Sequence, residues 1–224
     1  MSDVVEGATG SPWVLLRTGC ERAAIALGDL VSPPRCVACD VLLERRAVFC
    51  RTCAASVVVR PTLRDGTWAW VEWGGPIKEA IVRMKYGRRE DVGRALATIL
   101  ATTPLPERPR LDVLAPVPLH PKRLAARGFN QATLLARALG RAFDARLVTR
   151  RLVRTLDTSP QAQKSASERR AAVGEAFSAR GVAGLRVGVV DDVVTTGSTL
   201  AACSEALLAA GAVAVERFAL ARAD

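Results

Sequence analysis

Apolar and polar residues alternate along most of the chain with two different periods, one typical of strands and one of helices. Strand-like patterns cover residues 67–73, 111–117, 147–153, 185–193 and 213–221. Apolar residues at helical spacing cover residues 12–30, 76–86, 129–143 and 198–210. Strands that alternate with helices predict an α/β domain, in which a mostly parallel sheet is flanked by helices.

Two segments fall outside this alternation. Residues 155–175 are polar and carry no strand pattern, so they predict a long loop. The first ten residues lack the basic region and the long apolar run of a signal peptide. Charged residues such as Arg17 and Glu21 interrupt the apolar stretch from Trp13 to Val31. The sequence therefore predicts no membrane insertion and a soluble, cytoplasmic protein.

Size and composition fit this organisation and add a clue to the partner. The 224 residues, half of them apolar, suffice for one α/β domain and a small appendage. Lys and Arg number 32, and Asp and Glu number 22, so the formal net charge is +10. Such an excess favours a polyanionic partner, namely nucleic acid, a phosphorylated metabolite or an anionic surface. The alternative is that the base composition of the genome makes the chain rich in Arg and Ala, which explains the same excess equally well.

Four of the six cysteines form two C-x2-C pairs separated by ten residues. They are Cys36, Cys39, Cys50 and Cys53. Four thiolates in paired knuckles suit tetrahedral Zn²⁺ and leave no open coordination position, so the spacing predicts a structural zinc site. An iron–sulfur site and disulfides are the alternatives, and a reducing compartment argues against disulfides. The arginines around the cysteines either offset the negative zinc–thiolate centre or contact nucleic acid.

The most specific pattern is VGVVDDVVTTGSTL, from Val187 to Leu200. An apolar strand runs into Asp191 and Asp192, and a loop of small hydroxyl residues with Gly197 then opens a helix. Free N–H groups and the dipole at a helix N-terminus favour a phosphate, and glycine lets the backbone approach it closely. Two carboxylates beside such a loop would repel a phosphate unless they bind hydroxyls, as on ribose, or a metal ion.

This pattern resembles the phosphoribosyl pyrophosphate (PRPP) signature of the type I phosphoribosyltransferases. The resemblance implies that Asp191 and Asp192 hold the ribose hydroxyls of PRPP. It also implies that the following loop cradles the 5′-phosphate through Thr195, Thr196, Gly197, Ser198 and Thr199. Purine-salvage members of that superfamily usually carry an acid at the place of Thr195. The missing carboxylate disfavours purine salvage.

A basic run follows the predicted strand at 111–117. Lys122, Arg123 and Arg127 cluster beyond the carboxyl end of that strand, where α/β folds place their ligands. Because the acid motif belongs to the same fold, these cations suit the pyrophosphate of Mg²⁺–PRPP; a solvated loop with incidental charge is the alternative. His120 is the only histidine, so no second one completes a metal site.

The order of these motifs resembles the ComF family, the competence-associated phosphoribosyltransferase-like proteins. The matching segments are SPPRCVAC, FCRTC, KYG at 85–87, PVPLHPKRLAARGFNQ, the stretch from Gln161 to Phe177, and VVDDVVTTGSTL. Asp40 stands where the family usually has glycine, and Ala172 where asparagine is expected. The resemblance implies an N-terminal helix and zinc-binding module over residues 1–65 and a type I phosphoribosyltransferase-like domain over residues 66–224. It also implies a link to natural transformation and to the handling of single-stranded DNA.

One function open at this point is phosphoribosyl transfer. Asp191 and Asp192 would be the catalytic acids at the ribose of Mg²⁺–PRPP, and the acceptor is unknown. The 155–175 segment would act as a lid, from which Lys164 and Arg169 reach the pyrophosphate.

Two other functions involve no catalysis. In the first, the PRPP pocket is a sensor or relic, and the basic surface binds single-stranded DNA. Trp68, Trp70 and Trp73, next to the basic stretch 83–94, then either stack on bases or pack the zinc module onto the core. In the second, the chain is a scaffold whose zinc module recruits a helicase or another competence protein.

Overall fold

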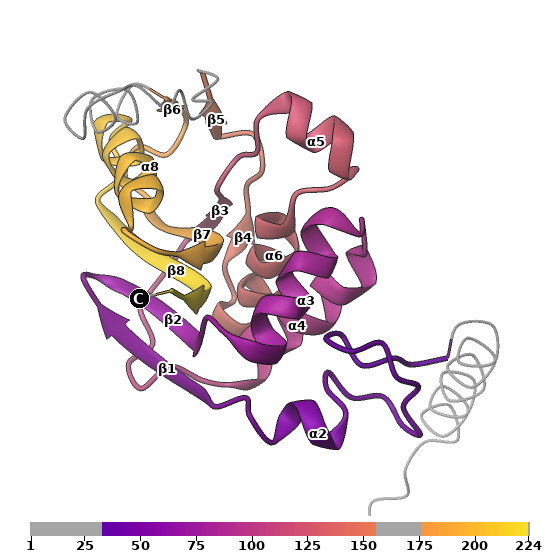
Figure 1. The fold of residues 1–224 in the computed structure, drawn as a ribbon. Coiled ribbons are helices and arrows are strands. Elements are labelled where there is room, and N and C mark those ends of the chain that lie inside the picture. The colour runs from indigo at the N-terminus through magenta and orange to yellow at the C-terminus, as the bar shows by residue number, and fades with distance from the viewer. Residues whose placement is uncertain (1–32, 156–175, 224) are drawn as a thin grey trace, which may run out of the picture.

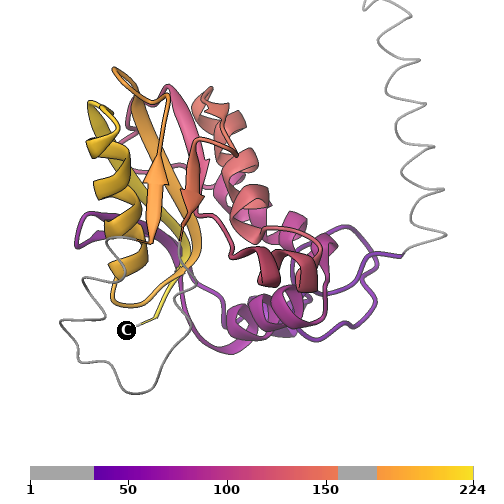
Figure 2. The same cartoon turned by 90° about the horizontal axis from the view of Figure 1, so that it is seen from above.

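The computed structural model describes residues 33–155 and 176–223 (Figure 1). The helix expected at 12–30 and nearly all of the loop expected at 155–175 lie outside these residues. Within them, an α/β architecture forms, with a sheet between two layers of helices (Figure 2). The predicted fold class, a mostly parallel sheet flanked by helices with a four-cysteine segment near the N-terminus, is confirmed.

Six strands form the main sheet in the order β1-β2-β8-β7-β3-β4. They are β1 (Val59–Arg64), β2 (Thr67–Glu72), β3 (Val113–Pro116), β4 (Arg146–Leu147), β7 (Arg186–Val194) and β8 (Ala214–Arg222). All neighbours run parallel except β1 and β2, which form an antiparallel hairpin at one edge. A separate antiparallel pair joins β5 (Leu152–Arg154) to β6 (Phe177–Ala179). The long central strands β7 and β8 therefore place their carboxyl ends at one common edge.

Helices cover both faces of the sheet (Figure 2). The described helices are α2 (Arg51–Ala54), α3 (Gly75–Tyr86), α4 (Glu90–Thr102), α5 (Pro121–Arg127), α6 (Gln131–Phe143) and α8 (Ser198–Ala209). Helices α3, α4 and α6 pack on one face, and α8 packs on the other. None of the helices within residues 33–155 and 176–223 is long and apolar enough to cross a bilayer.

Burial of alternating strand residues explains the two helical layers. In β7, Val190 belongs to the core under α3, α4 and α6, whereas Val187 and Val189 belong to the core under α8. On α3, Ile77, Ile81 and Met84 are each at most 2% exposed, which is the apolar stripe that their spacing predicted. The same periodicity in the sequence that predicted the elements thus also defines which face each one buries.

Most of the predicted elements form, but the structure differs from the prediction in several places. The strand predicted at 147–153 is wrong as a single element, because β4 and β5 lie in different sheets. The expected loop after β3 contains α5. The N-cap residue of this helix is His120, whose side chain accepts a hydrogen bond from the Lys122 backbone N–H. Helices α2 and α4 and strands β1 and β6 were not predicted. The expected boundary between residues 65 and 66 falls in the turn of the β1–β2 hairpin.

The tryptophans of β2 face the interior. Trp70 is fully buried and Trp68 is 8% exposed, and both belong to the core that includes α3 and α4. The indole N–H of Trp70 donates to the Thr103 carbonyl at 2.9 Å. These two rings therefore pack the core and offer no free face to a nucleobase.

Candidate functional site

The two acids of the signature point to opposite sides of the sheet. Consecutive side chains in a strand alternate between the faces, so Asp191 lies on the α8 side and Asp192 on the α6 side of β7. Asp191 lines a small pocket with the loop that opens α8. Asp192 is 3% exposed and lies against α3 and α6. The two adjacent acids therefore lie in two different environments, one on each side of the sheet.

The Asp191 side has the shape expected of a phosphate-binding turn. Its pocket is lined by Asp191, Val193, Thr195, Thr196, Gly197, Ser198, Thr199 and Leu200. Gly197, with φ of 73°, is the N-cap residue of α8 and has no side chain to cap the first N–H groups of that helix. The Thr196 hydroxyl donates to the Ser198 hydroxyl at 3.1 Å. Six of the seven residues predicted from the Asp191–Thr199 motif therefore line one pocket, and Asp192 does not.

The Asp191 carboxyl is held in an unfavourable environment for a charge. Burial and the neighbouring carboxylate of Asp192 hold the pKa of Asp191 well above its usual range. One stabilising contact opposes this, because Asp191 Oδ1 accepts the Asp192 backbone N–H at 2.8 Å. A carboxyl group with a raised pKa in a pocket is a common mark of a ligand-binding or catalytic position.

Asp192 is engaged by two side chains that the sequence alone did not identify as site residues. Lys85 Nζ lies 2.6 Å from Asp192 Oδ2, and Gln131 Nε2 donates to Asp192 Oδ1 at 3.2 Å. Lys85 closes α3 and Gln131 opens α6. Both lie within the KYG and PVPLHPKRLAARGFNQ segments, which was the signal available in the sequence.

Arg127 extends this network to the predicted pyrophosphate site. Its Nη1 donates to Gln131 Oε1 at 2.5 Å, and its Nε donates to the Lys85 carbonyl at 3.1 Å. Burial lowers the pKa of Arg127, and the negative charge of Asp192 opposes that effect. The structure therefore joins Arg127 to the acid motif through Gln131 and Lys85.

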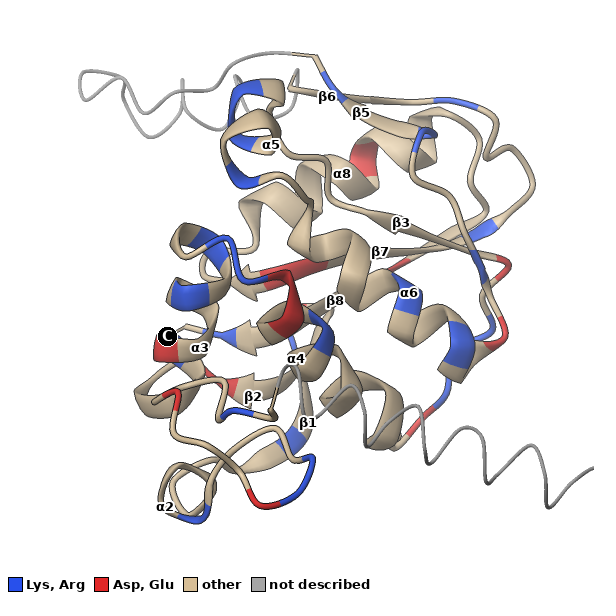
Figure 3. Cartoon of the chain, turned by 90° about the vertical axis from the view of Figure 1, so that its right-hand side faces the viewer, with Lys and Arg blue, Asp and Glu red and all other residues tan. Residues whose placement is uncertain are grey.

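Lys122 and Arg123 occupy a different position. Both lie on α5 and are exposed, about one turn before Arg127 on the same helix. Figure 3 colours the basic residues of α5 blue. Gly128, with φ of 87°, ends α5 and turns the chain toward α6. Of the three predicted cations, Arg127 is tied to the Asp192 side by its hydrogen bonds to Gln131 and to the Lys85 carbonyl.

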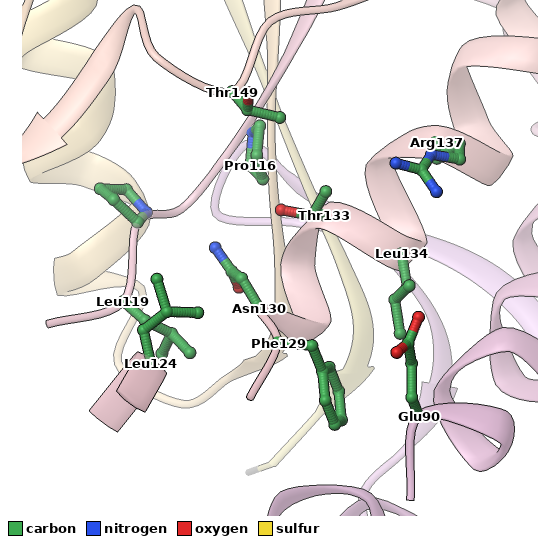
Figure 4. Close-up of a pocket in the computed structure, with 11 residues that line it drawn as sticks. Glu90, Pro116, Leu119, Leu124, Phe129, Asn130, Thr133, Leu134, Arg137 and Thr149 are labelled. Carbon is green, nitrogen blue, oxygen red and sulfur yellow. The ribbon is translucent and has the colours of Figure 1, made fainter. Parts of the chain in front are cut away.

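A larger cavity of about 410 Å³ is lined by residues of α5, α6 and the segments next to them. Leu119 and Leu124 lie on one side of it, and Leu134 and Arg137 of α6 on the other (Figure 4). Asn130 is at its base, where its side chain donates to the Val117 carbonyl and accepts from the Ala132 N–H. This cavity is mainly apolar and shares no lining residue with the pocket of Asp191.

The four predicted cysteine ligands come together in space. Their sulfur atoms all lie within 4.8 Å of one another, and Cys39 Sγ is 3.7 Å from Cys50 Sγ. Four sulfurs bound to a tetrahedral Zn²⁺ at about 2.3 Å lie about 3.8 Å apart. A disulfide needs an S–S distance of about 2.05 Å, and all four thiols are free. The cluster is therefore shaped as a four-sulfur metal site.

The thiols of this cluster influence one another's ionisation. Burial raises the pKa of Cys36, but the backbone N–H groups of Cys39, Cys50 and Ala38 outweigh it and lower that pKa to about 6. Burial and the neighbouring thiols raise the pKa of Cys53 far above its usual range. A negative charge on Cys36 thus disfavours ionisation of Cys53, and a bound divalent cation would offset that effect.

The cysteine segment is tied to the sheet domain by ionic contacts. Arg83 Nη2 of α3 lies 2.7 Å from Asp40 Oδ1, and Arg83 Nη1 donates to the Ala38 carbonyl at 3.4 Å. Arg89 Nη1 adds a second contact to the same Asp40 oxygen at 3.3 Å. Asp40 has φ of 63°, a conformation that favours glycine but that aspartate tolerates better than most residues.

Comparisons with known proteins identify relatives of similar length. No protein-family model matches the chain. It is 38% identical over 157 residues to DNA utilization protein YhgH of Salmonella typhi, covering 66% of this chain and 67% of that protein. It is 30% identical over 221 residues to Competence protein F of Haemophilus influenzae, covering 93% and 90%.

A likeness to a solved structure is weaker. The glutamine PRPP amidotransferase of B. subtilis, solved with ADP and GMP, is 24% identical, with a TM-score of 0.41. The match covers 60% of this chain but only 29% of the amidotransferase, so this chain spans under a third of that protein. The α/β class therefore rests on the strands and helices described above.

Proposed function

The chain belongs to the ComF family of competence-associated proteins, and from that premise we propose that it binds Mg²⁺–PRPP and acts in the handling of single-stranded DNA during natural competence. The observation that carries the proposal is the pocket in which Asp191 meets the hydroxyl-rich turn of residues 195–199. The names of the two relatives, Competence protein F and DNA utilization protein, support the link to DNA.

The chemistry of the pocket suits a phosphorylated ribose. The 5′-phosphate would accept hydrogen bonds from the N–H groups at the start of α8 and from the hydroxyls of Thr196 and Ser198. The ribose hydroxyls would donate to Asp191, whose carboxyl lines the same pocket. A neutral hydroxyl can satisfy a carboxylate beside a phosphate, whereas a second anion cannot.

Arg127, Lys122 and Arg123 would receive the pyrophosphate. They lie beyond the carboxyl end of β3, which neighbours β7 in the sheet. Mg²⁺ would reach this site with PRPP and offset part of the pyrophosphate charge. Support for this part of the proposal comes from the hydrogen bonds that join Arg127 to Gln131 and Lys85.

We propose that Cys36, Cys39, Cys50 and Cys53 hold a structural Zn²⁺. Four thiolates leave no coordination position for a substrate, so the ion would order the loops and supply no chemistry of its own. The sulfur separations support this ion, and the link through Asp40 and Arg83 would then transmit the order to α3. A helicase or another competence protein remains a candidate partner for this module.

For single-stranded DNA, the structure favours phosphate contacts over base stacking. Trp68 and Trp70 are buried, and Arg83 and Arg89 are paired with acids. Arg88 is exposed in the same segment. DNA would therefore bind through exposed arginines of this kind, with affinity that falls as salt rises.

Phosphoribosyl transfer is the second candidate function, since a bound PRPP could pass its ribose to an acceptor. The acceptor is not defined by the pocket, because Thr195 replaces the carboxylate found there in purine salvage. Calorimetric titration of the full chain with Mg²⁺–PRPP tests the binding proposal, with Asp191→Asn as the inactive control. Absence of heat with the wild-type protein contradicts it, and release of pyrophosphate with one base of a panel would favour transfer.

A further inference from the structure

Lys85 occupies a position between the two halves of the candidate site. Its ammonium group lies 2.6 Å from Asp192 Oδ2 on β7, and its backbone carbonyl accepts Nε of Arg127 at 3.1 Å. Its side chain is 23% exposed, whereas that of Asp192 is 4% exposed. One residue at the end of α3 thus contacts both the acid motif and the predicted pyrophosphate cation.

The need for a cation at this point follows from burial. Asp192 follows directly on Asp191, and a buried carboxylate is costly unless it is paired and hydrogen-bonded. Gln131 donates one neutral hydrogen bond to Asp192, and Arg127 reaches Asp192 through Gln131, so Lys85 provides the direct charge contact that the structure defines. Without Lys85, the Asp192 carboxylate beside Asp191 would lose the cation that contacts it in the described part of the chain.

We propose that Lys85 is a positioning residue of the PRPP site, which acts through Asp192 and Arg127. The inference rests on the proposed function and adds to it a residue outside the signature motif. Lys85 holds the Asp192 carboxylate in one orientation, which fixes the backbone and side chain of the neighbouring Asp191 for the ribose. Through its carbonyl and through Asp192 and Gln131, it also fixes the direction of Arg127 toward the pyrophosphate.

The test compares PRPP affinity of two lysine variants in the full chain. Lys85→Met removes the charge, and Lys78→Met is the matched control, because Lys78 is an exposed lysine on the same helix. We expect titration with Mg²⁺–PRPP to show binding at least about tenfold weaker for Lys85→Met and within about twofold of wild type for Lys78→Met. Lys85→Arg retains the charge and should recover part of the loss.

A double-mutant cycle distinguishes positioning from a structural role. If Lys85 acts through Asp192, Lys85→Met should weaken PRPP binding little further in a chain that already carries Asp192→Asn. An ion pair with only a structural role would show this coupling in the free energy of unfolding and not in PRPP affinity. Should Lys85→Met fail to fold, the double variant Lys85→Gln, Asp192→Asn replaces it, because it buries no unpaired charge.

The possible failures are separable. Wild-type protein that does not bind PRPP overturns the proposed function, and the inference with it. Wild-type binding that Lys85→Met leaves unchanged overturns the inference alone, as does wild-type affinity in the Lys85→Gln, Asp192→Asn variant.

Discussion

Arg83 and Asp40 form an ion pair at 2.7 Å that joins α3 to the cysteine segment. Arg83 lies two residues before Lys85, so the last turn of α3 contacts the cysteine segment with one side chain and the acid motif with another. The two predicted sites of this protein, which are far apart in the sequence, are therefore anchored on the same turn of one helix.

Asp40→Asn should loosen this junction without changing the backbone, because asparagine also tolerates a positive φ. Both side chains are about one-third exposed, so we expect a loss of about 0.5–1 kcal/mol in the free energy of unfolding. Urea denaturation measures it. Hydrogen exchange should rise in residues 36–53, and unchanged exchange there would show that the pair does not hold the segment.

The contribution of Asp40 should depend on pH in a defined direction. Burial raises the pKa of Asp40, but the hydrogen bond and charge of Arg83 outweigh it, so the folded-state pKa lies below the usual value. The stabilisation is therefore complete above the ordinary aspartate pKa of about 4 and is lost as the pH falls through the lower, folded-state pKa. Acid titration of wild type against Asp40→Asn should show the two stabilities converging.

Removal of one cysteine ligand should abolish metal binding. If the wild-type protein binds one equivalent of Zn²⁺, as proposed, we expect Cys39→Ser to lose it, since three thiolates bind the ion much more weakly. Elemental analysis after dialysis measures the content. Cys203→Ala is the control, because Cys203 lies on the buried face of α8 and belongs to the apolar core. Equal zinc content in Cys39→Ser and Cys203→Ala would contradict the assignment.

Asp191→Asn should stabilise the ligand-free protein while it abolishes PRPP binding. Because the folded-state pKa of Asp191 is raised, the folded protein loses stability as the pH rises from the ordinary aspartate pKa through that raised value. Asparagine removes this effect, and its Oδ1 can still accept the Asp192 N–H. We expect a gain on the order of 1 kcal/mol at pH 7. A stability equal to or below that of wild type in urea would refute the environment described for Asp191.

Gly197→Ala should weaken the phosphate turn. Alanine at φ of 73° costs about 1 kcal/mol in the free energy of unfolding, although its Cβ would meet only Val194 at 3.8 Å. Gly184→Ala is a matched control, because Gly184 has φ of 74° with nothing within 4 Å of a Cβ. Both variants should lose similar stability, but only Gly197→Ala should weaken binding of ribose 5-phosphate in a calorimetric titration. Equal binding by both variants would show that the Gly197 turn does not bind the phosphate.

Arg88→Glu should lower the affinity for single-stranded DNA and reduce its dependence on salt. Loss of one phosphate contact is expected to change the slope of log K against log salt by about one. Because Trp68 and Trp70 are buried, their fluorescence should change little on binding. Anisotropy titrations of a labelled oligonucleotide at several salt concentrations measure the slope, and an unchanged slope would exclude Arg88 from the interface.

The fold and part of the candidate site could be predicted because their signals are local. Strand β7, the Asp191 turn and α8 follow one another in the chain, so strand periodicity and turn chemistry predict them together. The two C-x2-C pairs are also local signals, because each pair brings two cysteines together within four residues of chain. By contrast, α5 has no buried residue to produce a periodic pattern, and the loop predicted in its place was wrong. The strand predicted at 147–153 failed because short apolar runs do not say which partner they pair with.

The amino-acid sequence by itself determined the α/β class, the cysteine ligand set, the acid-and-hydroxyl motif and the excess of positive charge. The tertiary structure alone decided that Asp191 and Asp192 face different layers, that Lys85 and Gln131 engage Asp192, and that Arg83 and Asp40 join the cysteine segment to α3. It also buried Trp68 and Trp70. The physical reason is that helix and strand periodicity and short metal-binding loops depend on residues close together in the sequence. The contacts of Asp192 and Asp40 depend instead on which distant side chains the packed layers bring together.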